Sequence, residues 1–397
     1  MAAPSTPRVP QNKTLRIRTI TAGVHLDDPA RLDRLDSAIS MLERGRERCS
    51  VAGFEVQTLR IATNPFVAAF NATQREHALR DLQAIDDLMT SHGTILSIGP
   101  VLIADRNDPE LAQWAAELAK TTKSISFSVA IAADTDVHSR AANTAAQVMI
   151  ELSRALADGM ANFRFAAAAN IPAGTPFFPV AWHQGEDSLA FGLESASLVE
   201  DAFVSLPVER DATMHLRSVF NRVLAPIAAL GAEFARSERR TWLGIDASPA
   251  PTLDRSIAGA IEAFTHQPFG SASTLQACAA ITAAIKSLEV KTCGYSGLML
   301  PVLEDPLLAQ RAVEGRYTLR DLLLYSSVCG TGLDVVPIPG DTPRDTIAAL
   351  LRDIAALSTR LNKALSARLF LVPGKSAGEI AKFDDAWLID SVVMKVD

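Results

Sequence analysis

The chain has 397 residues, of which 48% are apolar and 21% are charged, and its formal net charge at pH 7 is −7. This composition is typical of ordinary globular domains and excludes collagen-like, coiled-coil and broadly disordered proteins. The acidic balance argues against nucleic acid as a partner, because binding to a phosphate backbone requires an excess of Lys and Arg.

The first 14 residues are rich in proline and lack an apolar centre, so they predict a disordered lead rather than a signal peptide. No stretch reaches the roughly 20 apolar residues that a membrane span requires. We therefore expect a cytoplasmic protein with no membrane contact. The four cysteines show no CxxC spacing, which predicts free thiols.

Apolar runs rich in β-branched residues alternate with stretches of helical period along the chain, a pattern typical of an α/β protein with largely parallel strands. The expected strands are 15–24, 54–62, 94–104, 124–133, 162–170, 188–196, 241–247, 294–302, 333–339 and 367–373. The clearest expected helices are 28–49, 73–91 and 343–365, and the stretch 198–238 is also rich in helical sequence.

About ten strands favour a closed α/β barrel, because an open sheet of that size leaves two long edges to protect. We therefore expect residues 15–397 to form a single barrel domain. An eight-stranded barrel with extra strands and a dinucleotide-binding sheet are the second and third alternatives. The chain has no GxGxxG after its first strand and no GxxxxGK[ST], so no nucleotide cofactor is indicated.

The most unusual loop, 170–194, holds aromatic residues beside His183 and Glu186. A histidine and a carboxylate three residues apart can form an acid–base pair or contribute to a metal site, which makes both residues catalytic candidates. Alternatively, His183 donates to a backbone carbonyl and Glu186 is solvated.

A second candidate region follows the strand 241–247, where Asp246 and Ser248 precede two prolines. A rigid turn after a strand suits a catalytic or metal-binding carboxylate, so Asp246 is a candidate for both roles and Ser248 for substrate binding. The alternative is an aspartate that accepts hydrogen bonds from turn amides. With Asp246 and Glu186 as ligands, a divalent cation that prefers oxygen, Mg²⁺ or Ca²⁺, fits better than a thiolate zinc site.

Cys329 lies between glycines before the strand 333–339, and Asp334 lies within that strand. We consider Cys329 a weaker catalytic candidate and Asp334 a weaker substrate-binding candidate. A cysteine in such a turn is more often a small buried apolar residue.

Arginines recur inside the expected strands. Arg16 and Arg18 alternate along the first strand and so share a face, and Arg60 and Arg164 repeat the pattern in other strands. If this face lies inside a barrel, the arginines bind a carboxylate or phosphate, with Arg16 and Arg18 as the anion anchors. If it faces the helices, their stems pack and their charged ends reach water.

The segments LRIRTITAGVHL, TPFFPVAWHQGEDSLAFGLE, GIDASPAPT, GYSGLMLPVLED and CGTGLDVVPIPGDTP occur in an order that resembles the domain-of-unknown-function 711 family over residues 15–395. The resemblance implies a ten-stranded barrel similar to that of pyruvate formate-lyase-like glycyl radical enzymes. The radical motif Arg-Val-x-Gly-Tyr is absent, since the last glycine, Gly378, lies in KSAGEIAKF. Radical chemistry is therefore not expected.

These observations predict a soluble enzyme that acts on a small anionic or carbonyl-bearing metabolite inside the barrel by metal-assisted or acid–base chemistry. The alternative is a regulatory protein that binds a metabolite in the same pocket without turnover. The partner is then a small molecule, and the sequence leaves a homo-oligomer open.

Overall fold

The computed structural model describes residues 15–207 and 211–396; the expected disordered lead lies outside them. The main sheet contains ten strands, and it is mixed but mostly parallel. These strands are β1 (Arg16–Val24), β2 (Val56–Thr63), β3 (Thr94–Leu102), β4 (Ile125–Ala133), β5 (Asp136–Val137), β6 (Phe165–Ala169), β7 (Ser188–Glu194), β8 (Thr241–Ala250), β9 (Gly332–Pro339) and β10 (Leu365–Val372).

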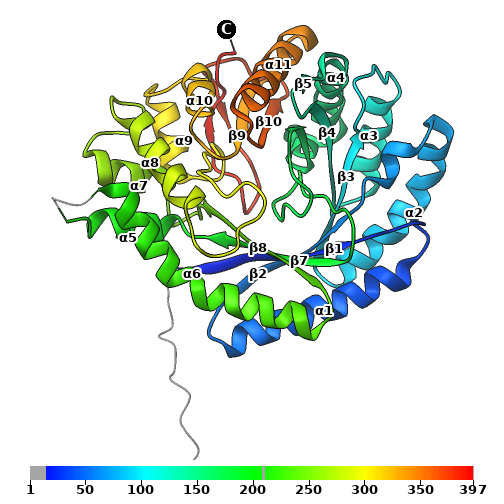
Figure 1. Cartoon of the computed structure of the whole chain (residues 1–397). Helices are drawn as coiled ribbons and strands as arrows, with labels where there is room; N and C mark the ends of the chain where they lie inside the picture. Colours follow the sequence, from blue (N-terminus) through cyan, green and yellow to red (C-terminus); the bar gives the residue numbers. More distant parts are fainter. Residues whose placement is uncertain (1–14, 208–210, 397) are drawn as a thin grey trace, which may run out of the picture.

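The helices lie around the outside of these strands (Figure 1). They are α1 (Leu32–Val51), α2 (Ala72–Ser91), α3 (Leu111–Thr121), α4 (Ser139–Ala155), α5 (Ala196–Val204), α6 (Ala212–Ser237), α7 (Ile257–Thr265), α8 (Thr274–Lys286), α9 (Pro306–Val313), α10 (Leu319–Tyr325) and α11 (Arg344–Leu361), with 3₁₀ helices η1 (Phe66–Ala69) and η2 (Ala157–Arg164). A two-stranded sheet of β11 (Ile380–Ala381) and β12 (Ser391–Val392) follows. No helix in the described part of the chain is long and apolar enough to cross a bilayer.

The strands are ordered β8-β7-β1-β2-β3-β4-β6-β10-β9, with β5 paired to β4. Neighbours in β1, β2, β3, β4 and β6 are parallel, but β1 pairs antiparallel with β7, and β6 pairs antiparallel with β10. Because β8 is parallel to β7 and β9 is parallel to β10, one end of the sheet carries the amino ends of β1 to β4 and β6 together with the carboxyl ends of β7, β8, β9 and β10.

The edge strands β8 and β9 are both contacted by the segment 291–302. Isolated bridges join Thr292 to Ile245 of β8 and Pro301 to Asp334 of β9. The expected strand 294–302 does not form, and β5 is the tenth strand instead. The backbone of Gly294 and Ser296 has positive φ, 62° and 40°, which breaks the extended conformation that a continuous strand requires.

The two faces of the sheet bury different apolar clusters. In β6, Ala167 and Ala169 belong to the large core that includes the helices, whereas Ala166 and Ala168 belong to a smaller cluster with Phe177, as the two-residue period of a strand requires. The loop 170–187 reaches this second face, because Thr21 Oγ1 donates to the carbonyl of Pro176 and Ser97 Oγ donates to that of Ala181. The small alanine side chains on this face of β6 leave room for the aromatic residues of the loop 170–187.

Local sequence also fixes the helix ends. Asn71 begins α2 with a capping box, in which its side chain accepts from the backbone of Gln74 and the Gln74 side chain accepts from the backbone of Asn71. We expect Asn71→Ala to lower the free energy of unfolding by about 1 kcal/mol, because an orphaned N–H loses its acceptor. Chemical denaturation measures this change. The matched control is Ser273→Ala, since Ser273 begins α8 without a side-chain capping bond; an equal loss in both variants would contradict the assignment.

Candidate functional site

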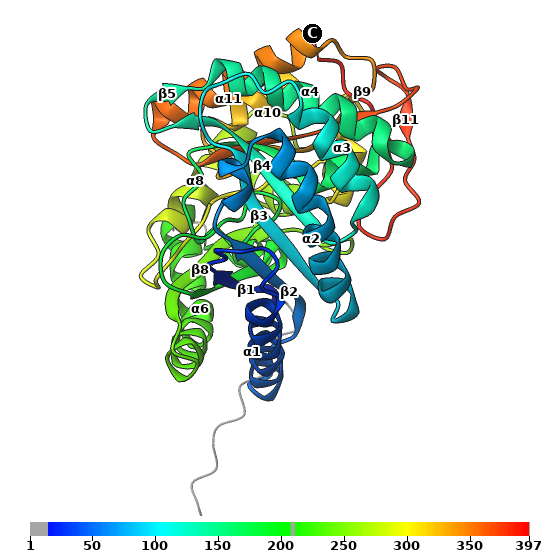
Figure 2. The ribbon, with the colours of Figure 1, turned by 90° about the vertical axis from the view of Figure 1, so that its right-hand side faces the viewer.

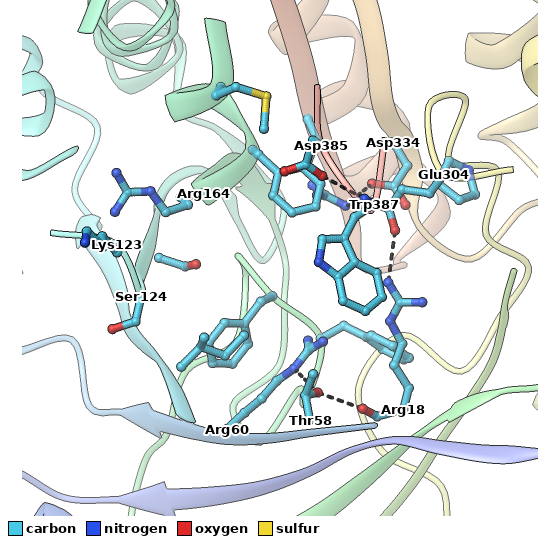
Figure 3. Close-up of a pocket in the computed structure, with 18 of the residues that line it drawn as sticks. Arg18, Thr58, Arg60, Lys123, Ser124, Arg164, Glu304, Asp334, Asp385 and Trp387 are labelled. Carbon is cyan, nitrogen blue, oxygen red and sulfur yellow. Dashed lines mark hydrogen bonds and ion pairs between the residues drawn. The ribbon is translucent and has the colours of Figure 1, made fainter. Parts of the chain in front are cut away.

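A cavity of about 600 Å³ opens at the mixed end of the sheet, where β1 to β4 and β6 begin (Figure 3). Its polar lining comes from residues distant in the sequence. These include Arg18 of β1, Thr58 and Arg60 of β2, Ser126 of β4, Glu304, Asp334 of β9 and Arg368 of β10. Ligands in parallel α/β folds usually collect at the carboxyl ends of strands. Here the two antiparallel junctions place the cavity at the amino ends of five strands instead.

A chain of ion pairs forms one wall of the cavity. Arg18 contacts Glu194 at 3.4 Å and Glu304 at 3.0 Å, and Arg368 contacts Glu304 at 3.1 Å and Asp334 at 2.9 Å. The side chains are 3–17% exposed, so the pairs are only weakly screened by solvent. Three carboxylates therefore share two guanidinium groups.

The two carboxylates that contact Arg368 have pKa values shifted in opposite directions. Burial raises the pKa of Asp334, which has Arg368 as its only ion-pair partner among the described residues. Burial acts in the same direction on Glu304, but Arg368 and Arg18 together hold the pKa of Glu304 below its usual value. Asp334 is thus the carboxyl of this pair that takes up a proton more readily. Burial also raises the pKa of Glu194.

Arg60 has a different environment from the other two arginines. It is 7% exposed, its Nε donates to Thr58 Oγ1 at 3.0 Å, and its guanidinium stacks on the ring of Phe178 at 5.0 Å. No carboxylate in the described residues lies within ion-pair distance of it, although Arg18 and Arg368 both have such partners. Burial lowers the pKa of Arg60 to about 9. The cavity wall therefore carries a buried cation that lacks a counter-ion.

The rest of the cavity wall is largely apolar. Phe163 of η2 stacks on the guanidinium of Arg368 at 4.9 Å, and Phe177 and Phe178 come from the inserted loop 170–187. The segment between β11 and β12 adds Asp385 and Trp387, with Lys120 and Lys123 across the cavity. Figure 2 shows β11 on the same side of the molecule as α3, near whose end the two lysines lie.

The structure brings together four of the residues singled out from the sequence, since Arg18, Arg60, Arg164 and Asp334 all line the cavity. Arg18 and Asp334 are joined through Glu304 and Arg368. Arg16 lies outside it, in an exposed ion pair with Glu55 at 3.1 Å.

His183 and Glu186 do not line this cavity. The buried ring of His183 contacts the carbonyl of Gly185 at 3.1 Å and Ser188 Oγ at 3.2 Å, and burial lowers its pKa. Glu186 is exposed. The geometry matches the alternative in which His183 bonds to a backbone carbonyl within its own loop.

Asp246 and Ser248 are also outside the cavity lining, and both are fully buried. Asp246 accepts four hydrogen bonds, from Ser248 N and Oγ and from the backbone of Tyr295 and Ser296, and burial raises its pKa. Because a carboxylate offers about four acceptor positions, these contacts occupy it. Asp246 thus fastens the turn at 295–296 to β8.

Cys329 is fully buried at the turn before β9, where its sulfur accepts from the backbone of Gly332. This is the environment of a small apolar residue. As for metals, nowhere in 15–207 or 211–396 do three His, Cys, Asp or Glu side chains gather as a metal ion requires. The proposed Asp246 and Glu186 ligands are not part of any such group.

Sequence reasoning did not select Arg368, Glu194 or Trp387. The signal for Arg368 is its place in LSARLFLV, because an arginine in an apolar strand needs a partner or a cavity. Arg60, in VQTLRIAT, carries the same signal. Trp387 has no such signal, since its loop reaches the cavity only through the tertiary fold.

Comparison with known proteins shows one family across the chain. A family model described as "Uncharacterised ACR (DUF711)" matches residues 9–384. A UPF0210 protein of Pyrobaculum arsenaticum is 29% identical over 398 residues, covering 92% of this chain and 87% of the relative. UPF0210 proteins of Desulforudis audaxviator (28%; 94% of this chain, 89% of the relative) and Acetivibrio thermocellus (25%; 97% and 92%) are similar over comparable lengths.

Proposed function

The chain belongs to the DUF711 family, and on that premise we propose that it is an enzyme that binds a small organic anion in the interior cavity and acts on it by acid–base chemistry. The proposal includes a closed barrel, in which the segment 291–302 completes the wall between β8 and β9. Its bridges at Thr292 and Pro301 support this closure.

The observation that carries the proposal is Arg60. Burying a guanidinium is costly unless an anion or other acceptors compensate it. Among the described residues, Arg18 and Arg368 pair with carboxylates. Arg164, which also lines the cavity, donates to the backbone carbonyls of Thr122 and Ala119. A ligand carboxylate at Arg60 would supply the missing charge through hydrogen bonds that are stronger than those between neutral groups. The 600 Å³ volume leaves space for such a ligand beside it.

Asp334 is the proposed proton acceptor and donor. It lines the same cavity as Arg60, and its raised pKa brings it closer to the range in which a carboxyl exchanges protons efficiently. Glu304 stays ionised between two arginines and holds Arg368 in place. Arg60 therefore anchors the anion and Asp334 moves the proton.

Calorimetric titration with short organic acids tests the proposal. We expect saturable binding of an organic acid by the wild-type chain and no binding of the corresponding primary alcohol. Asp334→Asn should keep the binding and lose proton exchange at the carbon or oxygen that reacts. Absence of binding by every acid tested would contradict the anion site, whereas binding without any chemical change would favour the regulatory alternative.

The affinity for the acid should depend on pH in a defined direction. Burial, helped by the like charges of Arg18 and Arg368 and opposed by Glu304 and Glu194, lowers the pKa of Arg60 to about 9, so its positive charge is present at neutral pH and is lost as the pH rises through that value. Anion affinity is therefore expected to hold in the neutral range and to fall as pH rises through 9. Titrations across this range measure the effect. An affinity that increases with pH would contradict the role of Arg60.

A further inference from the structure

The cavity is larger and more apolar than a short-chain acid requires. Its volume of about 600 Å³ is within the range of sites for drug-sized ligands, roughly 300–1,000 Å³. Beyond the arginines, apolar side chains of several elements line it. They are Met160, Phe163, Phe177, Phe178, Met299 and Trp387.

Aromatic rings lie beside the charged groups of the lining. The guanidinium of Arg60 stacks on the ring of Phe178, and Arg60 also lines the cavity. Figure 3 shows the indole of Trp387 projecting into the space near Arg18, away from Lys123 and Arg164. Trp387 is 50% exposed, although an indole of this size usually packs against other groups.

We infer that the ligand is an amphipathic monocarboxylate, with its head at Arg60 and an aromatic or bulky hydrocarbon body against Trp387 and the phenylalanines. This inference rests on the proposed function and adds the class of substrate. Arg60 and Arg164 line the cavity without a carboxylate partner in the described residues, but Arg164 donates to backbone carbonyls. Arg60 therefore leaves one positive charge for which a single negative charge is complementary. Asp385 lies beside Trp387 in the same lining and disfavours a second anionic group at that end.

Trp387 is then a residue that determines specificity. Its loop is held by the backbone contact of Ile389 with Leu303 and by Asp385, which accepts from the backbone of Trp387. These contacts hold the backbone that carries the indole at the cavity. A contact between two aromatic rings contributes free energy beyond that of the apolar area it buries, so an aromatic ligand gains from the indole.

The test compares propanoate, phenylpropanoate and phenylpropanol as ligands of the full chain by calorimetry. Phenylpropanoate should bind at least about tenfold more tightly than propanoate, because the ring removes apolar surface from water. Trp387→Ala should remove most of this advantage, so that the ratio of the two affinities falls towards one. The matched control is Leu324→Ala, since Leu324 is 52% exposed and lies outside the cavity.

The outcomes separate this inference from the proposed function. Equal affinities of the two acids, with both depending on Arg60, would overturn the amphipathic ligand and leave the anion site standing. An advantage of phenylpropanoate that survives in Trp387→Ala would overturn the role of Trp387. Binding of phenylpropanol as tightly as phenylpropanoate, or binding of neither acid, would overturn the anion site and with it the inference.

Discussion

Arg60→Gln is expected to weaken the binding of an organic acid by at least about 30-fold. Removing one partner of a buried charged pair costs about 2–5 kcal/mol, and 1.4 kcal/mol corresponds to a factor of ten in affinity. Glutamine keeps a hydrogen-bond donor but no charge. Calorimetric titration of both proteins with the same acid measures the loss.

The same substitution should change stability little, which distinguishes a ligand-binding arginine from a structural one. Arg60 has no carboxylate partner in the described residues, so its removal leaves no orphaned anion, and the free energy of unfolding should stay within about 1 kcal/mol of wild type. Arg16→Gln is the matched control, because Arg16 pairs with Glu55 at the surface. Equal weakening in both variants would show that general charge, and not the site, attracts the acid.

Arg368→Met is expected to lower the free energy of unfolding by about 3–5 kcal/mol, because it leaves Glu304 and Asp334 buried without their shared guanidinium. Methionine retains much of the apolar stem, so the loss reflects the charge and its hydrogen bonds. Denaturant unfolding at neutral pH measures it.

A double variant tests whether the loss of stability in Arg368→Met comes from the unpaired carboxylate. Glu304 keeps its ion pair with Arg18 in Arg368→Met, so adding Asp334→Asn removes the carboxylate that has lost its partner and should restore part of the stability, as expected for coupled neighbours. Arg344→Met is the control, since Arg344 pairs with Asp345 in solvent and should change stability by less than about 1 kcal/mol. A loss of similar size in the control, or no rescue by Asp334→Asn, would contradict the ion-pair account.

Most strands were predictable because their apolar and β-branched runs are long. The expected strands 188–196 and 333–339 correspond to β7 (Ser188–Glu194) and β9 (Gly332–Pro339). The segment 294–302 carries the same apolar signal, but the positive φ of Ser296 interrupts it, and no residue pattern announces that conformation. The helical stretch near 198–238 corresponds to α5 and α6. The assignment of residues 15–397 to a single domain stays a prediction.

The cavity lining was partly predictable, because arginines inside apolar strands are visible in the sequence. Alternation along the first strand predicted that Arg16 and Arg18 share a face, which could be interior or could face the helices, and Arg60 repeated the pattern; the structure places Arg18 and Arg60, but not Arg16, in the cavity lining. Other site residues were predicted because they are polar and follow a strand. Asp246 is one of them, but its oxygens accept hydrogen bonds from backbone amides of a turn nearly 50 residues away. Such long-range contacts are invisible in a sequence. The catalytic roles of His183, Glu186, Asp246 and Cys329 stay predictions, and the cavity does not include them.

The location of the site depended on topology. A fully parallel barrel would direct attention to the carboxyl ends of its strands. The antiparallel pairing of β1 with β7 and of β6 with β10 reverses β7, β8, β9 and β10 relative to β1, β2, β3, β4 and β6. Strand direction within a sheet is a tertiary property, so the sequence could indicate the arginines without indicating the end at which they meet.

A crystal structure of the chain with a bound organic acid would show whether Arg60 anchors the anion. We expect the carboxylate inside the cavity with both oxygens on the Arg60 guanidinium, at the roughly 2.7–2.9 Å of charge-assisted hydrogen bonds, and the ion pairs of Arg18 and Arg368 unchanged. Electron density for the acid only at Lys120 and Lys123, with Arg60 still without an anion, would contradict this expectation.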